Sequence, residues 1–184
     1  MSRFAVIDTE TTWSDAVMSI GTVIADCATF ELIDKKYYIL TPFKNHGGMY
    51  THALYANNIK PDLECSRENA MDKLKLFLIG HDVIAVFAYN AVFDYRHLPE
   101  LSRFEWYDIM KLAAYRQHNP KIPEYTKCCK TGRLKSGYGV ESIYRMLSDD
   151  RSYRETHNAL ADAIDELEIM RLMGHEPENY IKLK

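Results

Sequence analysis

Three apolar, β-branched segments follow one another in the first forty residues, at 4–8, 17–25 and 30–40. Only short turn-like stretches separate them, so the pattern predicts an antiparallel meander of hairpins. A continuous apolar run at 82–89 predicts a further strand that is buried on both faces, as strands of parallel sheets are. The chain must therefore build a mixed sheet.

Helical signals alternate with strand signals after the meander. Residues 41–65 are expected to be irregular, and a basic, proline-containing loop is expected before residue 139. The expected helices lie near 66–80, 91–98, 108–117, 139–147 and 158–173. The order predicts an α/β fold with a mixed central sheet, three antiparallel strands and then parallel strands, flanked by helices. We expect one domain over residues 1–184, with a core at about 4–173 and a short tail at 174–184.

The charge of the chain is unevenly distributed. Hydrophobic residues make up 47% and charged residues 27%, which is typical of a globular protein and not of a disordered one. The net charge of −3 argues against a uniformly basic coat for nucleic acid. However, residues 111–135 hold seven basic residues and one acid, a net of +6, which leaves −9 for the rest. This basic segment indicates an anionic partner, or else a solvated loop.

Targeting signals are not expected in this sequence. Asp8 comes before an apolar signal segment could form, and the apolar run at 83–89 is too short to span a bilayer. No C-x-x-C pair occurs among Cys27, Cys65, Cys128 and Cys129. We therefore expect a cytoplasmic protein with reduced thiols and no membrane partner.

The first chemical motif is Asp8-Thr9-Glu10, at the end of the first apolar segment. Side chains two apart on a strand project from the same face, so the two carboxylates can converge on one point. Burying both costs several kcal/mol unless they are paired or bind a metal. The alternative is a strand whose acidic end emerges into solvent.

Two further motifs carry acid and base groups. Asp94 lies where the buried strand passes into a helix, a place where α/β sheets present ligand-binding groups. Alone it also fits a helix-start acid, and Asn90 fits a turn residue. His157 and Asp162 are five positions apart, which places them about 140° apart around a helix. They can act together only if His157 precedes the helix; otherwise both are surface residues, with Asp162 beside the acidic Asp165, Glu166 and Glu168.

Together the motifs supply a coherent set of ligands. Four carboxylates without soft ligands favour Mg²⁺ or Mn²⁺. They can hold two divalent ions about 3.5–4 Å apart, the arrangement that serves phosphodiester cleavage. A neutral histidine beside the metals can accept a proton from the attacking water.

The order of the motifs resembles the DEDDh (DnaQ-like) 3′–5′ exonuclease family, which has a ribonuclease H-like fold. The resemblance rests on DTETT, NAVFD and HNALADA, at 8–12, 90–94 and 157–163. The flanking segments 18–26 and 107–114 also fit the family, so the resemblance spans nearly the whole chain.

The resemblance implies a role for each matched residue. Asp8, Glu10 and Asp162 would bind the catalytic ion. Asp8 and Asp94 would serve the second ion, Asp94 directly or through water. His157 would activate the attacking water, which releases nucleoside 5′-monophosphates from a 3′ end. The terminal nucleotide would contact the backbone at Thr11 and Thr12, and Asn90 is a further candidate for a substrate contact.

Two residues depart from the common family pattern. Trp13 stands where many members have glycine, and we expect it either to stack on the terminal base or to belong to the core. Tyr89 stands where many members have histidine. In the basic segment, Lys127, Lys130, Arg133 and Lys135 are candidates for contacts to upstream phosphates.

The sequence predicts a metal-dependent 3′–5′ exonuclease that acts on nucleic acid with a free 3′ end. The alternatives are a non-catalytic binding module on the same fold and a phosphodiesterase specific for short oligonucleotides. DNA and RNA both remain open as substrates, as do a polymerase and a second copy of the chain as partners.

Overall fold

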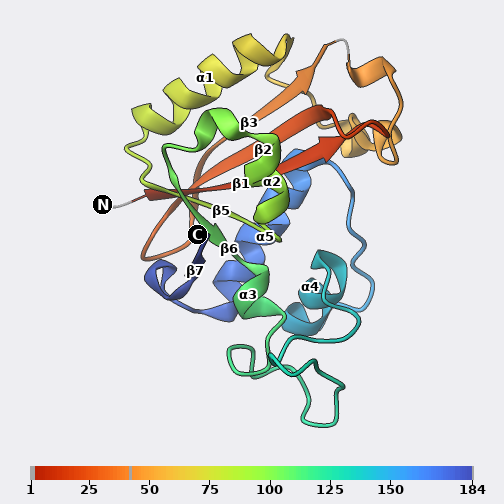
Figure 1. Cartoon of the computed structure of the whole chain (residues 1–184), viewed down its shortest axis with the longest axis vertical. Helices are drawn as coiled ribbons and strands as arrows, with labels where there is room; N and C mark the ends of the chain where they lie inside the picture. Colours follow the sequence, from red (N-terminus) through yellow and green to blue (C-terminus); the bar gives the residue numbers. More distant parts are fainter. Residues whose placement is uncertain (1–2, 42, 184) are drawn as a thin grey trace.

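The computed structural model describes residues 3–41 and 43–183. Its centre is a seven-stranded sheet with the order β4-β3-β2-β1-β5-β6-β7 (Figure 1). The strands are β1 (Arg3–Thr11), β2 (Val17–Asp26), β3 (Leu32–Leu40), β4 (Leu63–Cys65), β5 (Ala85–Ala88), β6 (Glu105–Asp108) and β7 (Ile181–Lys182). The helices are α1 (Arg67–Gly80), α2 (Val92–His97), α3 (Met110–Ala113), α4 (Val140–Ser148) and α5 (Ala159–Met173). Short 3₁₀ helices occupy Phe43–Asn45, Thr51–Ala53, Ala56–Asn58, Pro99–Leu101 and Pro177–Asn179.

The strand pairing confirms the predicted mixed sheet. Strand β2 pairs antiparallel with both β1 and β3, and β5 then pairs parallel with β1 and with β6. Helix α1 begins after Ser66, whose side chain accepts a hydrogen bond from the backbone of Asn69, and ends at Gly80. Helix α5 ends at Gly174, which has a left-handed backbone, as the sequence indicated.

The expected helix at 108–117 is wrong in its extent. Residues 105–108 form β6, and the helix that follows covers only 110–113. The side-chain amide of Asn119 donates a hydrogen bond to the carbonyl of Ala113, so a side chain takes the place of the next helical turn. Strand β6 has only four residues, and its parallel pairing with β5 defines it more clearly than the hydrophobic pattern of its sequence does.

Two edge elements were also missing from the predicted fold. Strand β4 pairs parallel with β3, although it lies in the segment 41–65 that was expected to be irregular. Pro42 of that segment lies outside the described residues. Strand β7 pairs antiparallel with β6, so part of the expected tail extends the sheet. Both are too short to carry a periodic signal.

Alternate residues of β1 face two different cores. Phe4 and Val6 belong to the cluster that includes residues of α4 and α5, whereas Ala5 and Ile7 belong to the cluster that includes residues of α1. Because side chains alternate along a strand, the even-numbered residues that follow Val6 also face α5. This alternation directs the first acidic motif toward the start of that helix.

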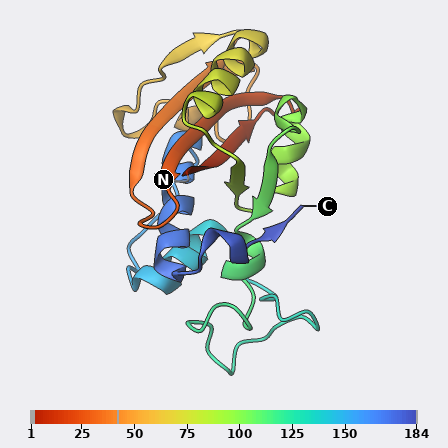
Figure 2. The same ribbon diagram turned by 90° about the vertical axis from the view of Figure 1, so that its left-hand side faces the viewer.

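A glycine lets α5 approach the sheet. Gly21 on β2 lies opposite Asp8 on β1, and a Cβ atom at Gly21 would lie 2.0 Å from the carbonyl oxygen of Ala159. Any side chain at this position would push the first turn of α5 away from the sheet. Figure 2 shows the same molecule from the side, with the chain between α3 and α4 protruding below the sheet and helices.

We predict that Gly21→Ala destabilises the protein. Overpacking of a close contact costs about 1–3 kcal/mol, which corresponds to a Tm lower by roughly 2–12 °C for a chain of this size. Thermal unfolding followed by circular dichroism measures the change. Gly80→Ala is the matched control, because nothing lies within 4 Å of a Cβ added there. Equal melting temperatures for the two variants would contradict the close approach.

Candidate metal centre

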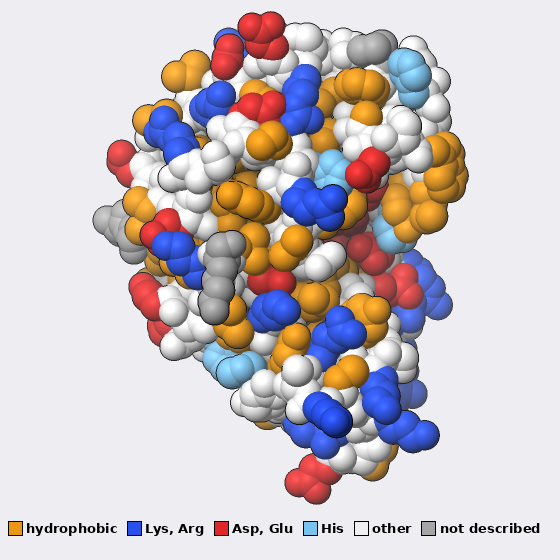
Figure 3. Space-filling view, in the orientation of Figure 1, with side chains coloured by type: hydrophobic (Ala, Val, Ile, Leu, Met, Phe, Trp, Pro, Cys, Tyr) orange, Lys and Arg blue, Asp and Glu red, His pale blue; other side chains and the backbone are white. Residues whose placement is uncertain are grey.

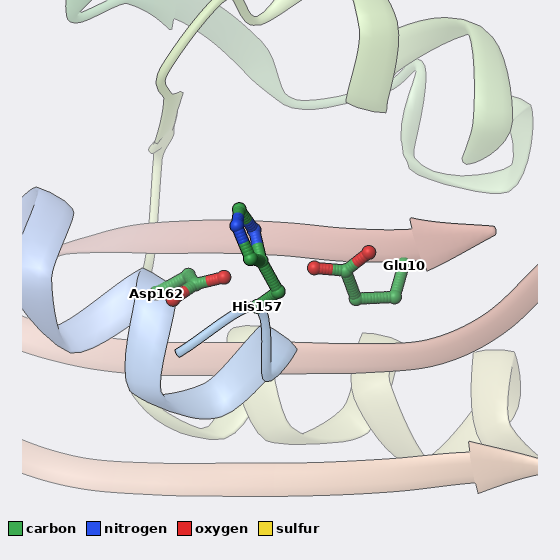
Figure 4. A group of neighbouring side chains, drawn as sticks. All are labelled: Glu10, His157 and Asp162. Carbon is green, nitrogen blue, oxygen red and sulfur yellow. The ribbon is translucent and has the colours of Figure 1, made fainter. Parts of the chain in front are cut away.

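The acidic motifs meet at one edge of the sheet, where β1 and β5 end and α2 and α5 begin. Figure 4 shows Glu10 on β1 and Asp162 on α5 with their carboxylates turned toward each other, and His157 between them. One ligand atom from each of the three lies within 4.8 Å of the others. The sequence motif at 8–10 and the motif at 157–162 are therefore brought together.

His157 precedes α5, as the spacing required. Asn158 is the N-cap of the helix, and its side chain accepts hydrogen bonds from the backbone of Leu160 and Ala161. His157 has a φ of 55°, in the left-handed region that residues with a Cβ rarely adopt. Asp162 lies inside the helix and is 2% exposed, so a solvated surface acid is the wrong interpretation.

Asp94 is buried in the first turn of α2. Its Oδ1 accepts a hydrogen bond of 2.8 Å from the hydroxyl of Thr9, the residue between Asp8 and Glu10. This bond ties the second motif directly to the first. Burial raises the pKa of Asp8, and the nearby Asp94 carboxylate is the next largest cause.

Sequence reasoning missed a further buried acid, Glu166. We expected it on a solvated face of the last helix, but it is 1% exposed, and its Oε2 accepts a hydrogen bond of 3.0 Å from the backbone of Tyr89. Four positions along a helix rotate by only about 40°. The spacing from Asp162 therefore did contain the signal that both acids share one face.

Burial and mutual repulsion dominate the electrostatics of this cluster. Burial, followed by the neighbouring Asp162, raises the pKa of Glu10 to about 9. Burial raises the pKa of Asp94 to about 7 and, with Glu155 adding to it, the pKa of Asp162 to about 8. The pKa of Asp8 is also raised, by burial first and then by Asp94. Such a cluster stays charged at neutral pH only with a nearby compensating positive charge.

The donor atoms fit a hard divalent cation. Oδ2 of Asp8 and Oδ1 of Asp162 are buried and have no hydrogen-bond partner among the described residues. Buried carboxylate oxygens are normally hydrogen-bonded or bound to a metal. The surrounding ligands are carboxylate oxygens and one imidazole, a set that suits Mg²⁺ or Mn²⁺.

Three neighbours hold the His157 ring and its loop. The ring stacks on Tyr50 with centroids 3.8 Å apart and an angle of 14° between the planes. Its Nδ1 lies 3.9 Å from the carboxylate of Glu155. The amide of the adjacent Asn158 donates hydrogen bonds to the carbonyls of Ala53 and Leu54. Burial lowers the pKa of His157, which favours the neutral imidazole.

A hollow of about 310 Å³ adjoins the cluster on the β1 side. Trp13 lines it and is 71% exposed, so the expectation of a core tryptophan is wrong. Thr11 and Thr12 also line the hollow, and the Thr12 hydroxyl accepts a hydrogen bond from the backbone of Ala16, which shapes the turn after β1. The remaining lining residues are Thr9, Glu10, Asp15, Met49, Tyr50 and Phe93.

Asn90 lies away from that hollow, directly after β5. It has a φ of 61°, and its backbone N–H donates to Oδ1 of the buried Asp108. Its surroundings include Arg133 of the basic segment. The structure therefore separates the four candidate substrate residues into two groups, one beside β1 and one beside β5.

Comparison with solved structures identifies the architecture. The nuclease domain of 3′hExo, a DEDDh family member bound to rAMP, superposes with a TM-score of 0.70 and 15% identity over 100% of this chain and 96% of that one. Exonuclease X in complex with 5′-overhanging duplex DNA gives a TM-score of 0.60 and 19% identity over 95% of both chains. The chain has the ribonuclease H-like fold of the DEDDh exonucleases.

A third similar structure is the zinc-ion-bound form of an E. coli exonuclease I complex with single-stranded DNA. It gives a TM-score of 0.59 and 13% identity over 97% of this chain and 42% of that one. No protein-family model and no curated protein sequence matches the chain. The structural likeness confirms the fold that the sequence motifs predicted.

We predict that the metal-free protein becomes less stable as the pH rises from about 4 to about 9. The folded pKa values of about 7, 8 and 9 for Asp94, Asp162 and Glu10 exceed those of the unfolded chain. The folded state thus holds protons that the unfolded state has released, and this stabilisation is lost as the pH passes through the folded values. Melting temperatures measured in chelator across this range test the prediction.

Divalent ions provide the control for that experiment. Mg²⁺ or Mn²⁺ is expected to raise the Tm more at pH 8 than at pH 6, because the ion competes with protons for the same oxygens. Asp162→Asn is expected to flatten the pH dependence. A Tm in chelator that rises with pH would contradict the assigned electrostatics.

Proposed function

We propose that the protein is a metal-dependent 3′–5′ exonuclease that hydrolyses phosphodiester bonds from the 3′ end of DNA or RNA. The observation that carries the proposal is the buried cluster of carboxylates beside His157 on the DEDDh exonuclease fold. The similar structures include complexes with DNA, which supports nucleic acid as the substrate class. No helix in the described part of the chain is long and apolar enough to cross a membrane.

The residues divide between holding the metal and moving a proton. Asp8, Glu10 and Asp162 would hold the catalytic ion, and Asp8 with Asp94 the second. Two bound divalent ions supply charge stabilisation for the attacking and leaving oxygens of a phosphodiester. Asp8 Oδ2 and Asp162 Oδ1 have no hydrogen-bond partner among the described residues, and such ions would coordinate these two oxygens.

His157 acts as the general base in this proposal. Its lowered pKa keeps the ring neutral and able to accept a proton near neutral pH. Nδ1 lies 3.9 Å from the Glu155 carboxylate, so in this proposal Nε2 would accept the proton from the attacking water. The stacked Tyr50 ring restricts the imidazole to one plane.

The hollow beside β1 would receive the terminal nucleotide. Trp13 presents an exposed indole there, and a base can stack on it regardless of sequence. Thr11 and Thr12 would contact the terminal sugar through their backbone. Asn90 would contact the substrate from the other side of the cluster.

A binding module without catalysis is the weaker alternative. Buried acids repel phosphates, and a protein that only binds nucleic acid gains nothing from them. A phosphodiesterase for short oligonucleotides shares the same centre, but it would not need the cations of the segment at 111–135.

We predict that Asp162→Asn and His157→Gln abolish shortening of strands from the 3′ end. Removing a metal ligand is expected to lower kcat at least ~100-fold, and removing the base about 10²–10⁴-fold. The assay uses 5′-labelled DNA and RNA with Mg²⁺ or Mn²⁺ and with free or blocked 3′ ends. Glu168→Gln is the matched control, because Glu168 lies on the same helix and pairs with Arg171.

The outcomes of that assay separate the alternatives. A ladder that shortens from a free 3′ end and disappears in the variants supports the exonuclease. Cleavage that ignores the 3′ block would identify an endonuclease, and binding without any cleavage would identify the binding module.

We also predict that Trp13→Ala raises KM for single strands about 5- to 100-fold with a smaller effect on kcat, because the loss of one stacked base costs about 1–3 kcal/mol. Trp13→Phe retains a stacking surface and is expected to recover most of the loss. Ile84→Ala removes a similarly exposed apolar side chain before β5 and serves as the control. An unchanged KM for Trp13→Ala would show that the indole does not stack on substrate.

A further inference from the structure

A second hollow lies beside the end of β5. Its volume is about 330 Å³, and it is lined by Tyr89, Asn90, Met110, Arg133, Tyr138 and Gly139. Asn90 lies four residues before the buried Asp94, so one wall of this hollow belongs to the same chain segment as the metal centre. In the sheet order, the hollow beside β1 and the hollow beside β5 lie at neighbouring strands.

An arginine and a tyrosine face each other in this second hollow. The guanidinium of Arg133 lies 4.7 Å from the centre of the Tyr138 ring, and no carboxylate of the described residues pairs with it. The Tyr138 side chain is 38% exposed, so part of its surface is open to solvent. The hydroxyl of Tyr89 donates to the Tyr138 carbonyl, which fixes this segment against the end of β5.

The cations of the basic segment fall into two groups. Lys121 pairs with Asp149, and Arg116 donates to the carbonyl of Thr126. Lys111 donates to the hydroxyl of Tyr115, so the fold itself uses these three side chains. The other group makes no ion pair within residues 3–41 and 43–183, and its members are Lys127, Lys130, Arg133 and Lys135. Figure 3 shows blue side chains gathered on the lower lobe, below a recess with red atoms at the side of the molecule.

The placement of the unpaired cations and of the exposed apolar side chains favours one orientation of a bound strand. A polyanionic strand is attracted to unpaired cations. Arg133 lines the hollow beside β5, and Lys127, Lys130 and Lys135 belong to the same protruding segment of the chain. The hollow beside β1 holds exposed apolar side chains, among them Trp13 and Met49, and the acid Asp15. The long, charged part of a strand is therefore favoured on the β5 side, and its end on the β1 side.

We propose that the hollow beside β5 binds the nucleotide immediately 5′ of the scissile bond of a single strand, with Tyr138 stacked on its base and Arg133 bound to its phosphate. This inference rests on the proposed exonuclease function. The strand then continues over Lys127, Lys130 and Lys135, which contact phosphates without reading sequence.

Binding in the absence of cleavage tests the inference first. In an Asp8→Asn background with Mg²⁺, the Kd of a 5′-fluorescein-labelled 12-nucleotide DNA or RNA strand is measured by anisotropy. Tyr138→Ala is expected to raise Kd about 5- to 100-fold. Arg133→Ala is expected to raise Kd and to lower the slope of log Kd against log salt by about 0.7, the value for one phosphate contact on a single strand.

Matched controls come from the same segment. Lys121→Ala removes a cation that is already paired, and Tyr125→Ala removes a tyrosine that is 89% exposed. Both are expected to leave Kd and the salt slope within twofold of the parent protein. Tyr138→Phe keeps the ring and is expected to restore binding, which separates stacking from loss of fold.

A small substrate separates this inference from the proposed function. The p-nitrophenyl ester of thymidine 5′-monophosphate has the scissile phosphodiester but no upstream nucleotide. These variants are made without the Asp8→Asn substitution. Tyr138→Ala and Arg133→Ala are expected to lower kcat/KM for strands and to leave hydrolysis of this ester unchanged.

Each result has one interpretation. Unchanged strand binding and kcat/KM in both variants, with active wild type, would overturn the inference and leave the exonuclease intact. Equal losses on strand and ester would place the terminal nucleotide in this hollow and also overturn it. A wild-type protein that binds strands through Tyr138 and Arg133 but does not cleave them would contradict the proposed exonuclease function. It would also contradict the placement of the bound nucleotide next to a scissile bond.

Discussion

Four carboxyl groups crowded into a poorly hydrated end of the sheet set the main electrostatic constraint on this fold. Glu10, Asp94 and Asp162 are buried and Asp8 is partly buried, and burial is the largest cause that raises the pKa of each. Repulsion from neighbouring acids adds to it. Among the described residues, no lysine or arginine is a main cause acting on the pKa of these four carboxyl groups. A bound cation would turn this unfavourable arrangement into a favourable one, because each carboxylate would then gain a positive partner. The unfavourable energy of the metal-free cluster would thus favour the binding of a divalent cation.

The backbone assembles this cluster through a few specific contacts. The alternation along β1 points Asp8 and Glu10 at α5, and Gly21 allows the helix to lie directly on the sheet. Asn158 begins the helix and at the same time donates hydrogen bonds to the carbonyls of residues 53 and 54. That segment follows Tyr50, which stacks on His157. His157, the proposed general base, is therefore positioned by contacts made far from it in sequence.

Much of this arrangement could be predicted from the sequence, because its signals are local. The meander, the buried strand and the last helix have clear periodicity, and the acids sit at predictable ends of those elements. The short strands β4, β6 and β7 could not be predicted, since pairing with neighbours defines them. The stacking of Tyr50 on His157 could not be predicted from the sequence either, because the two residues lie more than 100 positions apart. The burial of Glu166 could have been predicted from its four-residue spacing from Asp162, but its acidic neighbours on the helix indicated a solvated face.

Anomalous diffraction from crystals grown with Mn²⁺ would locate the bound ions. We expect two anomalous peaks about 3.5–4 Å apart at the edge of the sheet. One would be bound by Asp8, Glu10 and Asp162, and the other by Asp8 with Asp94. Well-ordered Mn²⁺ elsewhere with none at these carboxylates, or no bound ion at a pH where they are ionised, would show that the carboxylates do not form a metal centre.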